Sequence, residues 1–444
     1  MAISTRAILF TSGLISLMTP FTDTIYLPCL SDVQRELNTA PQLVALTVSC
    51  YLAAVALGQF IWAYLSDNYG RLVTFYVAML AYEGVTVGCI FVENIVQLLI
   101  LRTLQGFLAG AFISTSQGII SDVYADKERG TAMGIVFLFL LVGPIIAPLI
   151  GGYVSAVWTF RATFTCLVFL GFLVFMLTLI FVPETNVNST FIKPVTFPHG
   201  KDDKIEHIKE PKEKTSLVVD IFLPLIFLFD TEILPYVLTT SLHFMCMFTS
   251  LVILPVYLVL SPYNLDQGFV GLCFLPVGFS MLIGSLIGGI MADKSAMRYP
   301  NCPEGRMFIP LYAQLLSGVG TILFGYTLDI NKDTLGLVLF CHAILGFGQS
   351  GGMPSTMSFL SILKRENSAG ACAALTFLCF GFSSISISFS INLINQYSLT
   401  SFFVVLALMG LMVNVIALVI CHRKYNSINH LEVPCSEIVE IVSI

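Results

Sequence analysis

Charged side chains are scarce in this chain. Only 11% of its 444 residues are Asp, Glu, Lys or Arg, whereas soluble domains carry about 25%. The hydrophobic share is 56% and the mean hydropathy is +0.88. So few charges cannot cover the surface of a soluble protein of this size, and the composition predicts an integral, multi-pass membrane protein.

Motifs that carry catalysis are also missing from the sequence. It has no Walker-type phosphate loop, metal-ligand cluster or nucleophile constellation. The 12 cysteines lie mostly within apolar runs without paired spacing, which favours small buried side chains over disulfides or metal ligands. We therefore predict a protein that is not an enzyme and needs no cofactor or metal. The net charge of −6 is too small to indicate a charged partner, and we expect no nucleic-acid binding.

Long hydrophobic runs dominate what is present. Runs of roughly 20 apolar residues cross a hydrocarbon core of about 30 Å as helices. No small-residue cleavage site follows the first run, so we expect it to remain as a span. The twelve predicted spans are Ala7–Cys29, Leu43–Tyr64, Leu72–Val92, Ile95–Ser121, Met133–Ala156, Thr163–Val182, Ile233–Val259, Val270–Met291, Phe308–Leu328, Leu335–Leu360, Gly370–Ile394 and Phe402–Ile420.

Basic residues orient these spans. With both termini in the cytoplasm, seventeen of the 21 Lys and Arg fall on the cytoplasmic side, as the positive-inside rule requires. One sustained polar stretch separates spans six and seven, and we expect its charged part to be disordered and Leu217–Phe229 to lie on the inner membrane face. The predicted organisation is an N-terminal six-helix bundle (1–182), a cytoplasmic central loop (183–230), a C-terminal six-helix bundle (231–420) and a cytoplasmic tail (421–444).

The two halves look like repeats of each other. At the cytoplasmic end of the second span of each half, an aspartate follows a small residue by four positions: Asp67 follows Ala63, and Asp293 follows Gly289. Parallel six-span repeats build one large class of secondary transporters, whose substrate site lies at the repeat interface near the membrane midplane.

Several segments resemble motifs of the major facilitator superfamily, more narrowly its twelve-span drug:proton antiporter branch with fungal and bacterial multidrug resistance members. Ala63–Leu72 resembles the loop motif Gly-x-Leu-Ser-Asp-Arg-x-Gly-Arg-Arg and departs from it at Ala63, Asn68 and Leu72. The other matching segments are Asp23–Pro28, Leu98–Gly110 with Arg102, Gly143–Gly152, Phe181–Thr185 and Pro303–Arg306. The resemblance implies an all-α fold of twelve transmembrane helices in two six-helix pseudo-repeat bundles, the major facilitator fold.

Two groups of motif residues are expected to gate the conformational change. Asp67, Gly70 and Arg71, with Asp293 in the second half, are interpreted as a charged latch that breaks when the halves rock. The alternative is topogenic charge plus a turn glycine. Glycine and proline in span five suit a bending and sealing element between the halves, and a purely packing role is the alternative. These span-five residues are Gly143, Pro144, Pro148, Gly151 and Gly152.

Asp23 is the most informative single residue, because a carboxylate at bilayer depth costs at least about 2.5 kcal/mol. It lies about six residues below the outer end of span one, and Arg102 lies about seven residues below the same face on span four. By resemblance both spans line the central cavity, where the two side chains are expected to meet. We predict that Asp23 carries the coupling proton, or exchanges it for a cationic substrate, and that Arg102 tunes its affinity. A static structural ion pair is the alternative.

Glu83, near mid-membrane on span three, is a rival for this task. It either turns inward to pair with Arg102, which we favour, or forms a second protonatable group. The second half has no midspan carboxylate or lysine. Its His243 and His342 are read as packing residues, with proton sensing as the alternative. The predicted cavity-lining residues are Tyr26, Gln117, His243, His342 and Gln349.

Together these features predict a monomeric, proton-coupled secondary transporter that exports small organic compounds, drug-like, amphipathic or cationic, by alternating access. Its expected partners are the substrate, protons and the lipid bilayer. One alternative is a proton symporter or a polyamine or amino-acid carrier of the same fold, and another is a transport-inactive sensor on this scaffold. The plasma membrane is the expected location, with the vacuolar or another internal membrane as the alternative.

Overall fold

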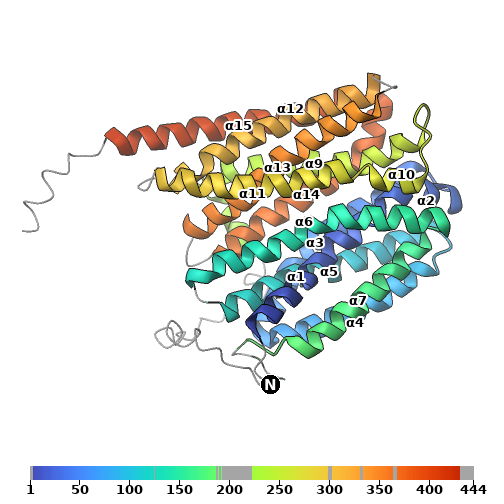
Figure 1. Ribbon diagram of the computed structural model, residues 1–444, viewed down its shortest axis with the longest axis horizontal. Coiled ribbons are helices and arrows are strands. Elements are labelled where there is room, and N and C mark those ends of the chain that lie inside the picture. Colours follow the sequence, from blue (N-terminus) through green and yellow to red (C-terminus); the bar gives the residue numbers. More distant parts are fainter. Residues whose placement is uncertain are drawn as a thin grey trace, which may run out of the picture.

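The computed structural model describes residues 4–124, 126–186, 189, 192, 223–298, 303–330, 334–363 and 368–430. Most of the predicted central loop and the last part of the predicted tail lie outside these residues. In the described part of the chain, 12 helical spans are long and apolar enough to cross a membrane, which confirms the predicted number and the all-α multi-pass fold. Figure 1 shows these helices running roughly along one direction, with the N-terminal and C-terminal halves side by side.

The N-terminal bundle holds six spans. Span one is broken, because α1 ends shortly after Pro20 and the chain continues through two short helical segments. Gly70 separates the second and third spans with a φ of +120°, a backbone conformation that glycine adopts readily. The elements are α1 (Thr5–Thr24), η1 (Leu27–Cys29), α2 (Leu30–Glu36), α3 (Pro41–Tyr69), α4 (Arg71–Ile90), α5 (Ile95–Val123), α6 (Asp126–Val157) and α7 (Arg161–Phe181).

The C-terminal bundle holds the other six spans. Its eighth span is broken into α10 and α11, and the Asp266 carboxylate caps the first of these by accepting from the backbone N–H of Gly268. The last helix runs on to His430, past the predicted span end at Ile420. The elements are η3 (Leu223–Phe229), α9 (Leu234–Val259), α10 (Gln267–Leu272), α11 (Leu275–Arg298), η4 (Pro303–Met307), α12 (Phe308–Ile330), α13 (Leu335–Leu363), α14 (Ser368–Gln396) and α15 (Leu399–His430).

The two bundles pack their helices in the same pattern. In the first, α3 lies along α5, and a Cβ added to Gly106 would come 2.3 Å from the carbonyl oxygen of Tyr51. In the second, α11 lies along α13, and a Cβ added to Gly288 would come 2.4 Å from the carbonyl oxygen of Gly351. Such approaches need glycine, since any side chain would separate the backbones. This correspondence agrees with the repeat predicted from the sequence.

The halves meet most extensively where α3 packs on α14 and where α6 packs on α10 and α11. On the first pair, the Ser49 hydroxyl donates to the carbonyl oxygen of Ser384 at 2.8 Å, and the Thr376 hydroxyl donates to Gln59 Oε1 at 2.9 Å. Following the predicted orientation, we call the end where α1 begins and α15 ends the inner end, and the opposite end the outer end.

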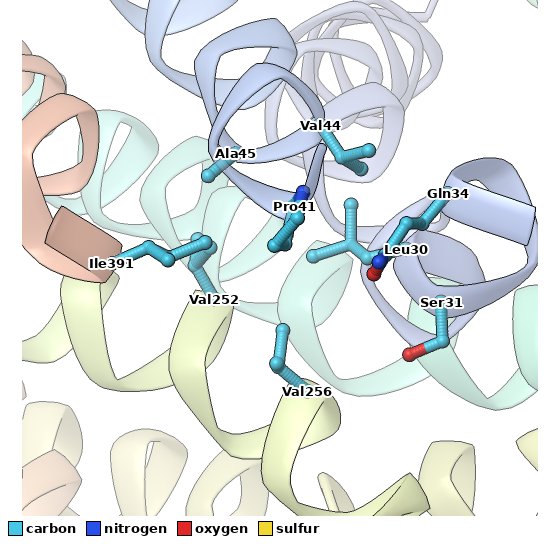
Figure 2. A pocket seen from close by; sticks show the side chains of 9 residues that line it. All are labelled: Leu30, Ser31, Gln34, Pro41, Val44, Ala45, Val252, Val256 and Ile391. Carbon is cyan, nitrogen blue, oxygen red and sulfur yellow. The ribbon is translucent and has the colours of Figure 1, made fainter. Parts of the chain in front are cut away.

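The outer end is closed where the halves meet at the start of α3. Figure 2 shows apolar side chains converging there, with Val252 and Val256 of α9 and Ile391 of α14 facing residues of the N-terminal bundle. The pocket left between them has a volume of about 10 Å³, roughly the size of one water and far below the several hundred Å³ of a drug-sized site. Its other lining residues are Leu30, Ser31, Gln34, Pro41, Val44 and Ala45.

Candidate functional site

Asp23 and Arg102 meet, as their matching depths and the family resemblance of their spans together predicted, and the pair is buried inside the N-terminal bundle. Asp23 lies in the last turn of α1 and Arg102 in the second turn of α5. The distance from Arg102 Nη2 to Asp23 Oδ1 is 3.7 Å, and 0% and 2% of the Arg102 and Asp23 side chains are exposed. Opposite charges at about 4 Å attract by about 4 kcal/mol at an effective dielectric constant near 20. This pair is therefore the electrostatic centre of the bundle.

The guanidinium of Arg102 is hydrogen-bonded through Nη1 alone and packs on two aromatic rings. Its Nη1 donates to Gln105 Oε1 at 2.8 Å and to the carbonyl oxygen of Thr22 at 3.3 Å. The carbon Cζ lies 4.4 Å from the ring centroid of Tyr51 and 5.1 Å from that of Tyr26. Cation–π contacts of this kind strengthen when they are desolvated. The predicted cavity residue Tyr26 thus packs against Arg102 and is buried.

The remaining polar atoms of the pair have no hydrogen-bond partner. Both carboxylate oxygens of Asp23 are buried and unbonded, as are Nε and Nη2 of Arg102. A separation of 3.7 Å is beyond hydrogen-bond range. Buried charges without hydrogen bonds are costly, so the pair can gain free energy by closing up, by taking a proton or by binding a further polar group.

Tyrosine and threonine side chains tie α1 to its neighbours around this pair. The Tyr51 hydroxyl on α3 donates to the carbonyl oxygen of Thr19 at 2.8 Å. The hydroxyls of Tyr82 on α4 and Thr22 on α1 lie 2.5 Å apart. Asp23 is therefore held on a helix whose position is fixed from two sides, so a change in its charge is felt by α3 and α4 as well.

Glu83 does not pair with Arg102, and the arrangement that we favoured from the sequence is wrong. Its carboxylate lies on a different face of α4 from that network, about 100° round the helix and against α7, where a Cβ added to Gly171 would come 1.7 Å from Glu83 Oε1. Both carboxylate oxygens are buried and without a hydrogen-bond partner. Glu83 points away from Arg102 because the preceding residue, Tyr82, occupies the face of α4 that points at α1.

Around Asp67, Gly70 and Arg71, which were predicted to form a latch between the halves, the structure has a larger charged network, and its bonds lie within the N-terminal half. Arg71 pairs with Asp67 at 2.5 Å and, through Nε, with Asp122 of α5 at 3.0 Å. The Glu184 carboxylate accepts from the backbone N–H groups of Arg71 and Leu72, both at 3.0 Å, and so caps α4. Sequence reasoning missed Asp122, although a carboxylate at the inner end of span four is visible in the sequence.

The C-terminal half carries a related inner latch. Asp293 at the end of α11 pairs with Arg306 of η4 at 3.2 Å, and Arg306 also hydrogen-bonds the Ser358 hydroxyl. Glu304 accepts from Lys424 of α15 at 2.7 Å. Charged bridges therefore stand at the inner end of both bundles, and each connects elements within one bundle.

Span five, helix α6, packs between α1 of its own bundle and the start of α10 in the other bundle. A Cβ added to Gly143 would meet Pro20 of α1 at 3.0 Å, and one added to Gly151 would come 1.9 Å from the carbonyl oxygen of Ile25. Toward the other half, a Cβ on Gly152 would come 2.4 Å from the carbonyl oxygen of Gln267. Both Pro144 and Pro148 lie inside α6. The same helix thus seals against α1 and against the C-terminal bundle.

Both predicted cavity histidines point into the C-terminal bundle. His243 Nδ1 bonds to the carbonyl oxygen of Thr239 at 2.8 Å, and its ring lies against Gly410 of α15. His342 Nε2 bonds to the Ser250 hydroxyl at 2.9 Å, and its ring packs on Phe324 of α12. Each has 0–1% exposure, so a cavity-lining role does not describe them here, whereas the packing interpretation does.

The last two predicted lining residues differ in burial. Gln349 on α13 is buried, with 3% exposure, and Gln117 on α5 is half-buried. Across the described residues, no group of three or more His, Cys, Asp and Glu is placed to hold a metal ion.

Comparisons with known proteins agree on one family. A family model described as Major Facilitator Superfamily matches residues 13–388. The chain is 34% identical over 178 residues to the MFS antiporter QDR3 of Candida albicans, covering 40% of this chain and 26% of that protein. It is 26% identical over 396 residues to the multidrug transporter AQR1 of Candida glabrata, covering 82% of this chain and 66% of that protein.

A further relative and a solved structure also match the chain. Citrate exporter 1 of Aspergillus niger is 26% identical over 304 residues, covering 63% of this chain and 56% of that protein. A POT family transporter solved in complex with 5-aminolevulinic acid superposes with a TM-score of 0.70 at 15% identity, covering 94% of this chain and 96% of that one. At this identity the likeness is one of fold.

Proposed function

This chain belongs to the major facilitator superfamily and is a multi-pass membrane transporter, and we propose that it exports small organic compounds, amphipathic or cationic, in exchange for protons. The observation that carries the proposal is the buried Asp23–Arg102 pair with its unbonded atoms. An ionised carboxylate with two free acceptor oxygens binds either a proton or the N–H groups of an ammonium. The relatives named antiporter, multidrug transporter and exporter support the direction of transport.

Exchange follows from competition at one carboxylate. A proton and a monovalent cation add the same charge to Asp23, so each excludes the other, and the Arg102 guanidinium beside it opposes holding both at once. The bound species shifts the conformational equilibrium only by its different affinity for the two states. A site that releases its proton inward and takes up substrate there therefore exports that substrate.

The gates are the contacts between the halves. We assign the outer closure to Gly152 of α6 and to the seam between α9, α14 and the start of α3. The Arg71 and Arg306 networks hold the inner ends of the two bundles as rigid bodies. Rocking then needs few contacts to break, because the charged bridges stay within each bundle.

The test uses proteoliposomes whose lumen is made more acidic than the outside. In an antiporter, protons leaving the acidic lumen drive an external organic cation into it. The direction is the same for both orientations of the transporter in the membrane. Asp23→Asn should reduce this accumulation at least about tenfold, since one lost charge-assisted contact costs about 1.5–3 kcal/mol. The matched control is Asp266→Asn, which changes an exposed carboxylate to an amide at the cap of α10 and should transport as wild type does.

Other outcomes would contradict the proposal. Substrate uptake that rises when the outside is acidic indicates a symporter. If Asp23→Asn protein still accumulates substrate against its gradient, Asp23 does not couple transport to protons. No flux in any protein, across a panel of cationic dyes, polyamines, amino acids and tetracycline-like compounds, indicates a sensor without transport.

A further inference from the structure

Helix α4 carries polar side chains on two different faces. Tyr82 and Thr86 face the Arg102 network, where the Tyr82 hydroxyl contacts Thr22 and the Thr86 hydroxyl accepts from Gln105 Nε2 at 2.8 Å. Glu83 lies about 100° round the helix from Tyr82, against Gly171 of α7. The Tyr82–Thr22 contact joins the two residues next to Glu83 and Asp23, so both carboxylates lie at the same level of the bilayer.

The α4–α7 seam that holds Glu83 borders the lipid. One helical turn before and after Glu83, the Leu80 and Val87 side chains are 60% and 39% exposed, and Phe172, next to Gly171, is 57% exposed. Exposed apolar side chains in the middle of a membrane-spanning helix are expected to face the hydrocarbon of the bilayer. Beside Glu83, a Cβ added to Gly84 would meet nothing within 4 Å. The Glu83 side chain is partly exposed, while its two carboxylate oxygens are covered.

The carboxylate group of Glu83 lacks any partner in this place. Neither oxygen has a hydrogen bond, and the backbone of α7 comes so close at Gly171 that a methyl group there would overlap Oε1. Burying a carboxyl group without a hydrogen bond costs several kcal/mol. The seam therefore holds a carboxylate without a partner in the protein, on a side chain that is itself partly exposed, and a cation from outside the protein can pair with it.

We propose that Glu83 and the α4–α7 seam form a lateral binding site for the ammonium head group of an amphipathic cation that arrives from the bilayer. The Glu83 carboxylate accepts from, or pairs with, the head group, and the hydrocarbon tail lies along Leu80, Val87 and Phe172. This proposal rests on the proposed export of amphipathic cations, and it adds a place where they bind before they reach Asp23. The two sites are distinct, since Glu83 forms no ion pair or hydrogen bond with Arg102 or Asp23 and its carboxylate lies against α7.

Labelling with a hydrophobic carbodiimide tests the site without needing transport. In the reaction the carboxyl proton moves to one carbodiimide nitrogen and a carboxyl oxygen bonds to the central carbon, and the adduct rearranges to an N-acylurea with no leaving group. The probes are dodecyltrimethylammonium and, as a control, dodecyl maltoside, which has the same chain and no charge. Mass spectrometry of peptides separates Glu83 from Asp23.

We expect Glu83 to be labelled in the wild type and equally in Asp23→Asn protein. Dodecyltrimethylammonium at ten times its Kd should slow this labelling about tenfold by mass action, whereas the maltoside leaves the rate unchanged. Glu83→Gln should lose the labelled peptide, and Glu93, which is exposed beyond the end of α4, should remain unlabelled in every protein.

Three results would overturn the site: no labelling of Glu83, equal slowing by both amphiphiles, or protection that disappears in Asp23→Asn protein. The outcome is independent of the transport assay. If Asp23→Asn transports normally while Glu83 is protected, the proposed coupling role of Asp23 fails and the lateral site stands. If Glu83 is not protected while Asp23→Asn loses transport, the lateral site fails and the coupling role of Asp23 stands.

Discussion

The two six-helix bundles bury their polar side chains in opposite ways. At the centre of the N-terminal bundle is a charged pair, Asp23 and Arg102, of which four polar atoms lack hydrogen bonds. Within the spans of the C-terminal bundle, the described polar centre is neutral and largely satisfied. Gln314 there accepts from the Thr239 hydroxyl at 3.1 Å and donates to the Thr240 hydroxyl at 2.9 Å.

This neutral network crosses the whole C-terminal bundle. Asn414 of α15 donates to Thr239 Oγ1 at 3.1 Å and to Gln314 Oε1 at 3.2 Å, and the hydroxyls of Thr240 and Thr356 lie 2.8 Å apart. It therefore links α9, α12, α13 and α15. Satisfied buried networks rigidify a core, whereas an unsatisfied charge is a place where binding changes the free energy. From this difference we propose that proton exchange takes place in the first bundle and that the second acts as its rigid partner.

Removing Arg102 should have the largest effect. Arg102→Met leaves Asp23 buried without its counter-charge, a loss of about 3–5 kcal/mol for a broken buried pair. We expect proton-driven accumulation to fall by at least about a hundredfold at 1.4 kcal/mol per tenfold. The measurement is uptake into proteoliposomes with an acidic lumen.

Poor folding of this variant is separated from lost coupling by a second protein. The double variant Asp23→Asn with Arg102→Met removes both charges, so it should recover most of the folded yield, measured by size-exclusion chromatography, and still fail to couple. Coupled transport by the double variant would show that the Asp23–Arg102 pair is only structural. The N-terminal bundle would then have no special role in proton coupling.

The sequence predicted what the bilayer imposes. Length and hydrophobicity of each span are set by the thickness of the hydrocarbon, so the twelve spans could be read directly. Depth along a helix follows from residue number, and the family resemblance placed spans one and four around the same cavity, so the meeting of Asp23 and Arg102 was predictable.

Rotation of a helix about its axis was not predictable in the same way. Spans that are apolar on nearly every face have no polar stripe to show which side points inward. The orientations of Glu83 and His243 were missed for this reason. Each side chain packs against a glycine of a neighbouring helix, Gly171 for Glu83 and Gly410 for His243. The bond between Arg71 and Asp122 was missed for a related reason, since it joins helix ends that are 51 residues apart in the chain.

The contact between the bundles is the next target. Gly152→Ala places a methyl group 2.4 Å from the carbonyl oxygen of Gln267 and 3.1 Å from Gly271 Cα, so the outer closure must loosen. Overpacking of this kind costs about 1–3 kcal/mol, and we expect up to about tenfold slower transport with more of the outward-open state. Gly134→Ala is the matched control on the same helix, because its added methyl would meet nothing within 4 Å.

The readout for this state is reaction of Gln34→Cys with a membrane-impermeant maleimide, since Gln34 lines the closed outer seam. Labelling should be faster with Gly152→Ala than with Gly134→Ala. Equal labelling would mean that α6 is not part of the outer closure, which would then rest on the seam between α9, α14 and the start of α3.

The neutral network should matter for stability more than for transport. Gln314→Leu leaves the Thr240 hydroxyl without its donor and Thr239 without its acceptor, each costing about 1–3 kcal/mol. We expect a lower thermal unfolding midpoint in detergent, and transport per folded molecule within about threefold of wild type, a factor worth about 0.6 kcal/mol. A loss of proton coupling with unchanged stability would place chemistry in the second bundle and break the comparison.

The smallest effect is expected at His342, the histidine bonded to Ser250. His342→Gln keeps a polar atom near the Ser250 hydroxyl and gives up the ring contact with Phe324, which together amount to about 1 kcal/mol. Transport should stay within about twofold of wild type, or about 0.4 kcal/mol, and its dependence on the pH gradient should keep its shape. Ser250→Ala, which removes the same hydrogen bond from the other side, should behave alike. If His342→Gln alone flattened the response to the pH gradient, an imidazole of the C-terminal bundle would be carrying protons, and the division between a charged, changeable bundle and a neutral, rigid one would no longer hold.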